Sequence, residues 1–442
     1  MTVLDAIFAA GVVGDGGAGF PTHKKLVSGA KLMIVNAAEC EPLLASDRYV
    51  MRHFAGEVVG ALTVVQTELG IPRVVIGTKA HYTAEIAALR EAIAAAGSDI
   101  EIHPVESFYP AGDEQVLIYE ITGETVPPGG IPLALGIVVV NVTTAYAIAQ
   151  ALDGHPVTRR YVTVNGAVNH PVIVDVPVGT TPADLIAAAG GTTLGAYRII
   201  RGGPLMGRQV PMEQAAAFGY GKADGGLIVL PLNSPVVTLH DKPLERVILE
   251  ARSICIQCSL CTELCPRYLI GHQMRPHRVM RSVATGTHPE DLTDALLCCE
   301  CGICELFACP MGLSPREMNI TVKASLREAG VKAADPAIHP EHTAARPYRR
   351  IAQSRFIARL DLAAYPNHLE EAIRIDPPSV KIPLRHGVGK PARPVVSAGD
   401  QVSAGQVIAE VGRDEVGCLV HASLAGRVAA VTADHIHIEA GR

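Results

Sequence analysis

Cysteine is concentrated in one short part of the chain. Nine of the eleven cysteines lie between residues 255 and 309, in two runs that are separated by 32 residues. Closely spaced thiolates are strong ligands for soft metals, and cysteines two residues apart can contact the same metal centre. The two runs therefore predict a metal-dependent redox function. The candidate ligands are Cys255, Cys258, Cys261, Cys265, Cys298, Cys301, Cys304 and Cys309.

The spacing within the runs indicates iron–sulfur clusters. The first run has the pattern C-x2-C-x2-C-x3-C-P, in which three cysteines bind one cluster and the fourth binds its neighbour, as in bacterial ferredoxins. In the second run, four residues rather than three separate Cys304 from Cys309. We expect two [4Fe-4S] clusters with crossed ligand sets, which are Cys255, Cys258, Cys261 and Cys309 for one and Cys298, Cys301, Cys304 and Cys265 for the other.

Two other interpretations of the cysteines stay open. A pair of structural zinc ions would also use C-x2-C pairs, although zinc ribbons contain paired rather than triple runs. A disulfide framework fits poorly with a long chain in which we find no secretion signal. Cys299 adjoins a predicted ligand, and we interpret it as a packing thiol rather than a ninth ligand.

The composition is that of an ordered protein with several domains. The chain has 442 residues, of which 48% are hydrophobic and 19% charged, and a net charge of −6. No basic block is present to bind a phosphate backbone, which argues against a nucleic-acid partner. Residues 125–152 carry no charged side chain but contain several prolines and glycines, so we interpret them as a buried strand and helix. We therefore expect a cytoplasmic protein that is not an integral membrane protein.

A glycine-rich stretch near the N-terminus is the second candidate site. It satisfies the pattern G-x-G-x-x-G, but a helix over residues 2–13 is expected before it, where the dinucleotide-binding fingerprint requires a strand. Glycines still allow backbone N–H groups to approach an anion or a flat ring. The alternative is a flexible turn. The residues of this stretch are Gly14, Gly16, Gly17 and Gly19, with Lys25 following.

Strands and helices alternate over the first 150 residues. A strand over residues 31–35 leads into Asn36, Glu39 and Glu41, and open α/β sheets bind their ligands at this end of a strand. Glu114 lies where a helix is expected to begin, so it either binds a ligand or caps that helix. Further helices are expected at 52–69 and 82–96, and further strands at 73–77, 100–104 and 137–142.

The later segments change character. Strands at 161–166 and 172–177, followed by a helix at 181–189 with Thr181 as its N-cap, suggest a β-grasp module. The last 65 residues have short β segments separated by turns, which suggests the barrel-sandwich hybrid fold of biotinyl and lipoyl carriers. The lysine that carries the cofactor in such modules is absent, so we expect a docking or structural module.

The order of these modules resembles that of the flavoprotein subunit of respiratory complex I and of the RnfC-like electron-transfer subunits. Residues 14–21 look like the flavin loop G-x-G-G-A-G-F-P of those families. Residues 36–42 look like their second flavin and NADH motif, with Ala38 in place of an acidic residue. With its barrel-sandwich module at the C-terminus, the whole chain is similar to the cobalamin reductase family of propanediol-utilisation microcompartments.

The resemblance implies a multidomain α/β and α+β architecture. Its parts would be a flavin-binding α/β domain (1–154), an SLBB-like β-grasp module with a β-rich connection (155–243), an α-helical ferredoxin-type two-cluster domain (244–330), a linker (331–376) and a C-terminal barrel-sandwich hybrid (377–442). NADH would pass hydride to FMN, and FMN would release electrons singly to the clusters. By resemblance, the FMN contacts would be Gly14, Gly16, Gly17, Gly19, Lys25 and Asn36, and the NADH contacts Phe20, Glu39, Glu41 and Glu114.

The resemblance also implies an acceptor and partners. The acceptor would be the cobalt of a corrinoid, and the partners a corrinoid adenosyltransferase and the shell proteins of a bacterial microcompartment that encloses the protein. The Asp-x-His-x-x-Gly signature of cobalamin-binding proteins does not occur in the sequence. Two alternatives stay open. One is an RnfC-like NADH-oxidising subunit that feeds another redox protein, and the other is a non-enzymatic electron-conducting or assembly module without flavin.

Overall fold

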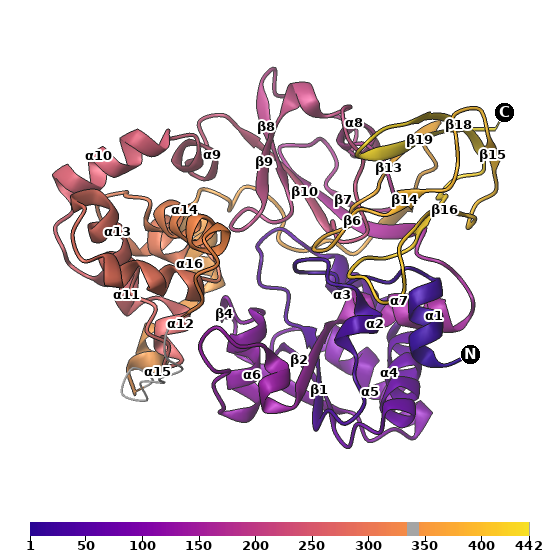
Figure 1. Ribbon diagram of the computed structural model, residues 1–442, viewed down its shortest axis with the longest axis horizontal. Coiled ribbons are helices and arrows are strands. Elements are labelled where there is room, and N and C mark those ends of the chain that lie inside the picture. The colour runs from indigo at the N-terminus through magenta and orange to yellow at the C-terminus, as the bar shows by residue number, and fades with distance from the viewer. Residues whose placement is uncertain (334–343, 442) are drawn as a thin grey trace.

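The N-terminal part of the chain is a three-layer α/β unit (Figure 1). The computed structural model describes residues 1–333 and 344–441. The elements of this unit are α1 Val3–Ala9, α2 Thr22–Lys25, β1 Leu32–Ala37, α3 Ser46–His53, α4 Ala55–Leu69, β2 Val74–Lys79, α5 Thr83–Ala96, β3 Glu101–Val105, β4 Phe108–Tyr109, α6 Glu114–Thr122, η1 Pro132–Leu135, β5 Ile137–Asn141 and α7 Val142–Leu152.

The central sheet of this unit is parallel, in the order β3-β2-β1-β5. Strands β1, β2 and β5 are rich in β-branched residues and buried on both faces, as is typical of parallel sheets. Helices α1, α4, α5 and α7 pack on one face and α6 on the other. The carboxyl ends of the strands therefore share one edge, which is the edge where such sheets bind ligands.

Two helices of this unit differ from the expectation. The first ends at Ala9 rather than near residue 13, because Gly11 adopts a left-handed conformation (φ +66°) that ends helices. The helix expected over residues 52–69 is divided at Phe54, whose backbone angles are not helical. The ring of Phe54 packs against Tyr146, with 4.5 Å between ring centroids. The strands expected at 73–77, 100–104 and 137–142 are present as β2, β3 and β5.

A mixed sheet forms the β-grasp region. Strands β6 and β7 form the expected antiparallel hairpin, and the last strand of the region runs parallel to β6. Thr181 caps the following helix as predicted, with its hydroxyl oxygen accepting from the Asp184 N–H at 3.2 Å. The elements are β6 Arg159–Gly166, β7 Val172–Pro177, α8 Pro182–Ala188, β8 Tyr197–Arg201, β9 Arg208–Pro211, η2 Met212–Gln214 and β10 Gly226–Pro231.

Short helices surround the two cysteine runs. An apolar core that includes Val247, Met280 and Met318 holds three of them together. Figure 1 shows these helices as a separate lobe beside the α/β unit. The elements are α9 Pro235–His240, α10 Leu244–Ile254, α11 Leu260–Glu263, α12 Pro266–Leu269, α13 Pro276–Thr285, η3 Pro289–Leu297, η4 Ile303–Ala308 and α14 Pro315–Glu328.

The segment expected to be a linker is packed where the structure describes it. It contains α15 Arg346–Arg349, β11 Ile351–Ala352, α16 Gln353–Arg359 and β12 Ala372–Arg374. Strand β11 pairs with β4 of the α/β unit, and β12 extends the β-grasp sheet beside β7. Part of the expected linker, residues 334–343, lies outside the described residues.

The C-terminal module consists of two small antiparallel sheets that enclose one apolar core. Its strands are β13 Ser379–Pro383, β14 Arg393–Pro394, β15 Gln401–Val402, β16 Val407–Glu410, β17 Val420–His421, β18 Gly426–Val431 and β19 His435–Ala440. This module contacts the loop that follows α1, far away in the sequence. Within the described residues, no helix has the length and apolar character needed to cross a bilayer.

Candidate functional site

The glycine loop, residues 14–19, lies at the carboxyl edge of the parallel sheet. The Asp15 N–H donates to the Thr144 hydroxyl at the start of α7, at 2.9 Å. A Cβ atom on Gly16 would lie 3.0 Å from the Asn141 side-chain nitrogen, at the end of β5. The loop is thus placed at the edge that binds ligands in this class of fold.

The loop is open where a ligand could approach. Gly16 has a φ of +69°, which residues with a side chain rarely adopt. A Cβ atom on Gly17 would meet no atom within 4 Å. Gly14 is held by its N–H, which donates to the Phe20 carbonyl at 2.8 Å. The Phe20 side chain is partly exposed, at 37%. The open space beside Gly17 and the exposed ring of Phe20 suit a flat ring system.

Several predicted contact residues converge beside the loop. Lys25 Nζ lies 2.7 Å from Glu114 Oε1, so the structure brings together residues assigned by resemblance to FMN and to NADH. The Asn36 amide donates to the Gly112 carbonyl at 2.8 Å. Asp113 caps α6 and also accepts from Arg267 Nη2 at 2.9 Å, which ties this edge to the cysteine-bearing lobe.

Three carboxyl groups near this edge have raised pKa values. Burial raises the pKa of Glu39 to about 7, although the Glu41 N–H donates to its Oε1 at 2.9 Å and opposes that shift. Burial likewise raises the pKa of Glu41 to about 7, and burial next to Glu39 raises the pKa of Asp47 to about 8. Carboxyl groups in such surroundings can donate hydrogen bonds near neutral pH.

Two acidic residues at this edge were not among the site residues predicted from the sequence. Asp47 accepts hydrogen bonds from the Asn141 amide at 2.8 Å and the Thr143 hydroxyl at 2.9 Å. Asp15, within the glycine loop, pairs with Arg160 at 2.9 Å. Asn141 at the end of a strand was the one available signal, because polar residues follow ligand-binding strands in open sheets.

The predicted cluster cysteines lie near other cysteines, both from their own run and from the other run. Burial raises the pKa of Cys261 to about 12, and the thiols of Cys309, Cys258 and Cys255 raise it further. These neighbours are the other members of the first predicted ligand set. Metal binding would remove those protons, since thiolates are the ligands. The assignment of individual ligands stays a prediction.

The second set contains no exposed cysteine, whereas Cys258 of the first set is exposed. The hydrogen bond that the Cys301 thiol donates to Cys299 raises the pKa of Cys301, and burial with the thiols of Cys265 and Cys304 adds to the shift. Hydrogen bonds with Cys301 and Arg267 lower the pKa of Cys299 to about 7, and its interpretation as a packing thiol stays a prediction. No group of three or more histidine, cysteine or acidic side chains in residues 1–333 and 344–441 converges tightly enough to hold a single metal ion.

Tyr109 connects the carboxylate edge of the sheet with the second cysteine run. Its hydroxyl donates to the Cys301 carbonyl at 2.7 Å and is near enough to Glu41 to lower the pKa of that carboxyl. Glu41 Oε1 is buried and has no hydrogen-bond partner among residues 1–333 and 344–441, since the tyrosine proton is directed to the carbonyl. Leu205 donates from its N–H to Glu41 Oε2 at 2.8 Å and lies in the same apolar core as Cys301 and Tyr109.

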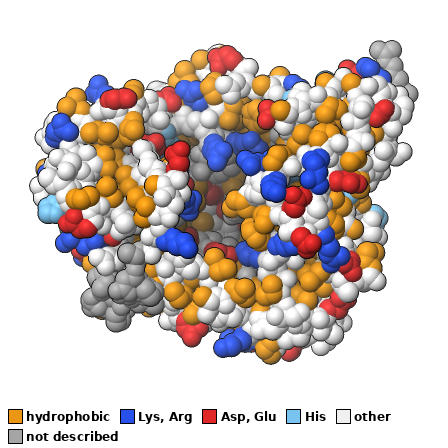
Figure 2. Space-filling model, in the orientation of Figure 1, with side chains coloured by type: hydrophobic (Ala, Val, Ile, Leu, Met, Phe, Trp, Pro, Cys, Tyr) orange, Lys and Arg blue, Asp and Glu red, His pale blue; other side chains and the backbone are white. Residues whose placement is uncertain are grey.

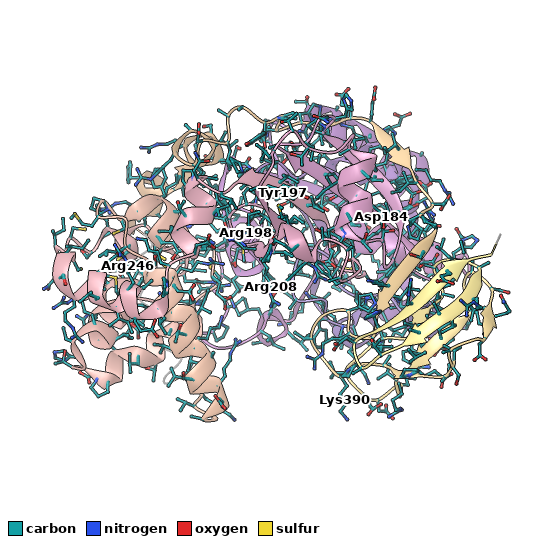
Figure 3. All side chains as sticks on the ribbon, turned by 90° about the horizontal axis from the view of Figure 1, so that it is seen from above. Asp184, Tyr197, Arg198, Arg208, Arg246 and Lys390 are labelled. Carbon is teal, nitrogen blue, oxygen red and sulfur yellow. The ribbon has the colours of Figure 1, made fainter. Side chains whose placement is uncertain are left out.

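A hollow opens between the α/β unit and the cysteine-bearing lobe. Figure 2 shows it near the centre of this face, with Lys and Arg side chains gathered along its upper rim. From above, Arg198 and Arg208 on β8 and β9 lie between Arg246 on α10 and Lys390 in the C-terminal module (Figure 3). The β-grasp sheet thus lies between the two ends of the molecule.

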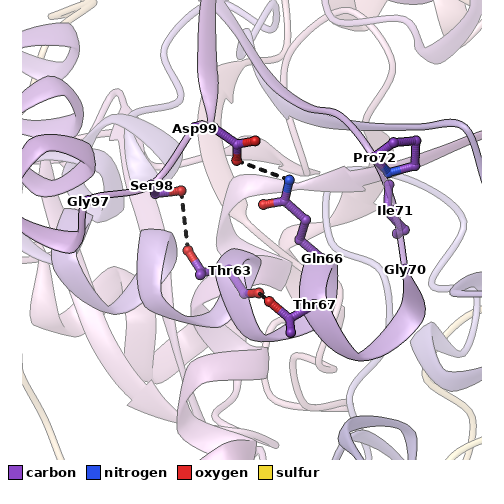
Figure 4. Close-up of a pocket in the computed structure, with 9 residues that line it drawn as sticks. All are labelled: Thr63, Gln66, Thr67, Gly70, Ile71, Pro72, Gly97, Ser98 and Asp99. Atoms are coloured by element: carbon purple, nitrogen blue, oxygen red, sulfur yellow. Dashed lines mark hydrogen bonds between the residues drawn. The ribbon is translucent and has the colours of Figure 1, made fainter.

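A second depression lies at the opposite edge of the parallel sheet (Figure 4). Polar side chains cross it, with Gln66 Nε2 donating to Asp99 Oδ1 at 3.1 Å and Thr63 Oγ1 donating to Ser98 Oγ at 3.4 Å. It is shallow and lies before β2 and β3 begin, so it is not placed to serve the glycine loop.

Comparison with protein families matches four segments of the chain. These are the Nuo51 FMN-binding domain at residues 7–150, the SLBB domain at 161–209, the 4Fe-4S dicluster domain at 254–314 and the RnfC barrel sandwich hybrid domain at 369–441. The matches confirm the predicted fold class, a flavin-binding domain and an iron–sulfur domain. The domain boundaries predicted from the sequence stay predictions.

The chain is similar over its whole length to one kind of reductase and over part of its length to other redox proteins. It is 38% identical to cobalamin reductase PduS of Salmonella typhimurium over 445 residues, which cover 99% of this chain and 96% of that protein. It is 35% identical to one subunit of the ion-translocating oxidoreductase complex of Erwinia tasmaniensis over 278 residues, which cover 61% of this chain and 32% of that protein. An NAD+-reducing [NiFe]-hydrogenase structure shares the fold, with a TM-score of 0.50 and 20% identity over 75% of this chain and 63% of that one.

Proposed function

Because the chain belongs to the family of cobalamin reductase PduS, we propose that it is an NADH-dependent reductase of corrinoid cobalt. It would take cob(III)alamin to cob(II)alamin and towards cob(I)alamin, for recycling coenzyme B12 in propanediol utilisation. The observation that carries the proposal is the position of Tyr109. Its buried hydroxyl lies between Glu41, at the predicted nicotinamide side, and the backbone of the predicted cluster ligand Cys301.

FMN fits the residues at the glycine loop. When bound, FMN would supply the conversion between two-electron and one-electron chemistry. Open space beside Gly17 would admit the flat ring, and the buried Oε1 of Glu41 is an acceptor that has no donor among the residues that the structure describes. We assign FMN contacts to Gly14, Gly16, Gly17, Gly19, Lys25 and Asn36.

We assign NADH contacts to Phe20, Glu39, Glu41 and Glu114. Phe20 is exposed enough to stack on a flat ring. Glu39 and Glu41 are partly exposed despite their raised pKa values, so they can hydrogen bond a ribose or an amide. Glu114 would complete the set, with Lys25 holding its position.

Two [4Fe-4S] clusters would carry electrons away from the flavin edge. The neighbours of Cys261 and Cys301 support the two crossed ligand sets predicted from the sequence. In the second set, Tyr109 and Leu205 would fix the distance between the clusters and the carboxylate edge.

A second candidate function is favoured by one observation. The similarity to an ion-translocating oxidoreductase subunit extends over 278 residues, so the acceptor can instead be another redox protein. If the acceptor is a corrinoid, the proposed partners are a corrinoid adenosyltransferase and microcompartment shell proteins. If the acceptor is another redox protein, these partners are not proposed.

The test uses protein purified without oxygen. Iron, sulfide and flavin are quantified, and NADH is then added with hydroxocobalamin while the corrinoid spectrum is followed. The proposal expects bound flavin, two clusters and cob(II)alamin formation. Flavin and clusters that are reduced by NADH without any corrinoid reduction would favour the second candidate. Protein that carries zinc and no flavin would contradict both.

A further inference from the structure

The C-terminal module contacts the glycine loop through backbone atoms. The Val388 N–H donates to the Ala18 carbonyl at 2.8 Å. A Cβ atom on Gly387 would lie 2.4 Å from the Ala18 oxygen and 2.5 Å from Gly19 Cα, and a Cβ atom on Gly19 would lie 2.3 Å from the His386 oxygen. Side chains do not tolerate such distances, so the two segments can approach this closely only with glycine on both sides.

A buried lysine strengthens the same contact. Lys222 Nζ donates to the Gly11 and Leu419 carbonyls, both at 2.8 Å, and its backbone N–H donates to His386 Nδ1 at 3.1 Å. Lys222 is 4% exposed, and burial lowers its pKa. A buried ammonium group requires such hydrogen bonds. The lysine therefore joins the end of α1 to the C-terminal module.

The loop is held on its other side as well. Asp15 pairs with Arg160 of β6 at 2.9 Å, and its N–H donates to the Thr144 hydroxyl at 2.9 Å. The loop is thus fixed at Asp15 and at Ala18, while Gly17 between them adjoins open space. A loop that is already ordered loses less conformational freedom when it binds a ligand.

We propose that the C-terminal module is a clamp that orders the glycine loop for FMN, with Gly387 and Lys222 as positioning residues. The inference rests on the proposed placement of FMN at this loop. It gives a role to a module of the carrier fold that has no carrier lysine. The clamp acts on flavin affinity and not on the iron–sulfur clusters, which lie in the other lobe.

The test compares two glycines of the same module. Gly387 and Gly399 both have positive φ angles, +139° and +99°, but a Cβ atom on Gly399 would meet nothing within 4 Å. FMN is removed from the cluster-containing protein and titrated back while its fluorescence is followed. We expect Gly387→Ala to weaken FMN binding about tenfold and Gly399→Ala to change it less than about twofold. Iron content should stay at the wild-type value in both variants.

Two further variants separate a failure of the clamp from a failure of the proposed FMN placement. Gly17→Glu adds a carboxylate in open space at the loop and should abolish FMN binding if the placement of FMN is right. If Gly17→Glu loses FMN but Gly387→Ala binds it like wild type, the clamp is wrong and the proposed function stands. If neither variant affects binding, the placement of FMN fails. If Gly387→Ala does not fold, Lys222→Met replaces it. We expect faster amide exchange in residues 14–19 of this variant, and unchanged exchange would contradict the clamp.

Discussion

The two predicted sets of cluster cysteines differ in the exposure of one ligand. The inner set, Cys265, Cys298, Cys301 and Cys304, adjoins Tyr109 and contains no exposed cysteine, although its buried members are no deeper than Cys261 and Cys309 of the other set. The outer set is Cys255, Cys258, Cys261 and Cys309, and Cys258 in this set is exposed. An exposed ligand would help a cluster that delivers electrons to an external acceptor, and it is not needed in a cluster that receives them within the protein.

The surroundings of the two sets differ in the same sense. Ile256, Leu260 and Met311 beside the outer set are exposed, and exposed apolar side chains at one place mark contact surfaces. Beside the inner set, Lys323 Nζ donates to the Cys298 carbonyl at 2.6 Å and Arg316 donates to the Glu300 carbonyl at 2.8 Å. Nearby cations favour a reduced cluster, because reduction adds negative charge, and the carboxylates of Glu300 and Glu305 beside them offset part of this effect. We infer that electrons enter at the inner set and leave at the outer set.

Removing one ligand from each set should have the largest effect. Cys301→Ser and Cys258→Ser should each remove about half of the iron, since each would destroy one of two clusters. Only Cys258→Ser should retain a cluster that NADH reduces, because its inner set remains beside the flavin edge. Iron analysis and electron paramagnetic resonance after NADH addition measure both. If only Cys301→Ser keeps an NADH-reducible cluster, the direction of electron flow is the reverse.

Tyr109→Phe should weaken the link between the flavin edge and the inner set. The Cys301 carbonyl would lose its donor in a buried site, which lowers stability by about 1–3 kcal/mol. Reduction of the inner cluster by NADH should slow, while iron content stays constant, as measured by stopped-flow absorbance and thermal unfolding. Tyr348→Phe is the matched control, since Tyr348 is 88% exposed. Equal unfolding temperatures for the two variants would show that the buried hydroxyl contributes nothing.

Lys323→Met should lower the reduction potential of the inner cluster alone. Losing this cation should shift the potential by about 60 mV, equal to about 1.4 kcal/mol for one electron. Lys332→Met, at an exposed position just beyond α14, serves as the control. Anaerobic redox titration followed by electron paramagnetic resonance separates the two clusters. A shift confined to the outer cluster would mean that the ligand sets are assigned wrongly.

The sequence predicted those parts of the site that local spacing determines. The cysteine runs, the glycine loop and the strand before Asn36 each lie within a few residues, so their geometry follows from short-range patterns. Contacts between distant segments could not be predicted this way. Tyr109 and Cys301 are 192 residues apart, and Gln353 in the expected linker accepts from the buried Lys79 at 2.9 Å. Such pairs depend on how the lobes pack, and no single-sequence pattern encodes that.

The smallest expected effect concerns the proton on the Asp47 carboxyl group, at the carboxyl edge of the parallel sheet. Burial raises its pKa in the folded protein from the ordinary 3.8 to about 8, so folding favours the protonated form and stability falls as pH rises from about 4 to 8. Asp47→Asn cannot lose this proton, and the amide still accepts from Asn141. For flavin-free protein, the unfolding temperature of the variant minus that of wild type should therefore increase by about 2 °C or more between pH 5 and pH 8. A difference that is independent of pH would place the ionised carboxylate in the folded protein and contradict the buried acid at this edge.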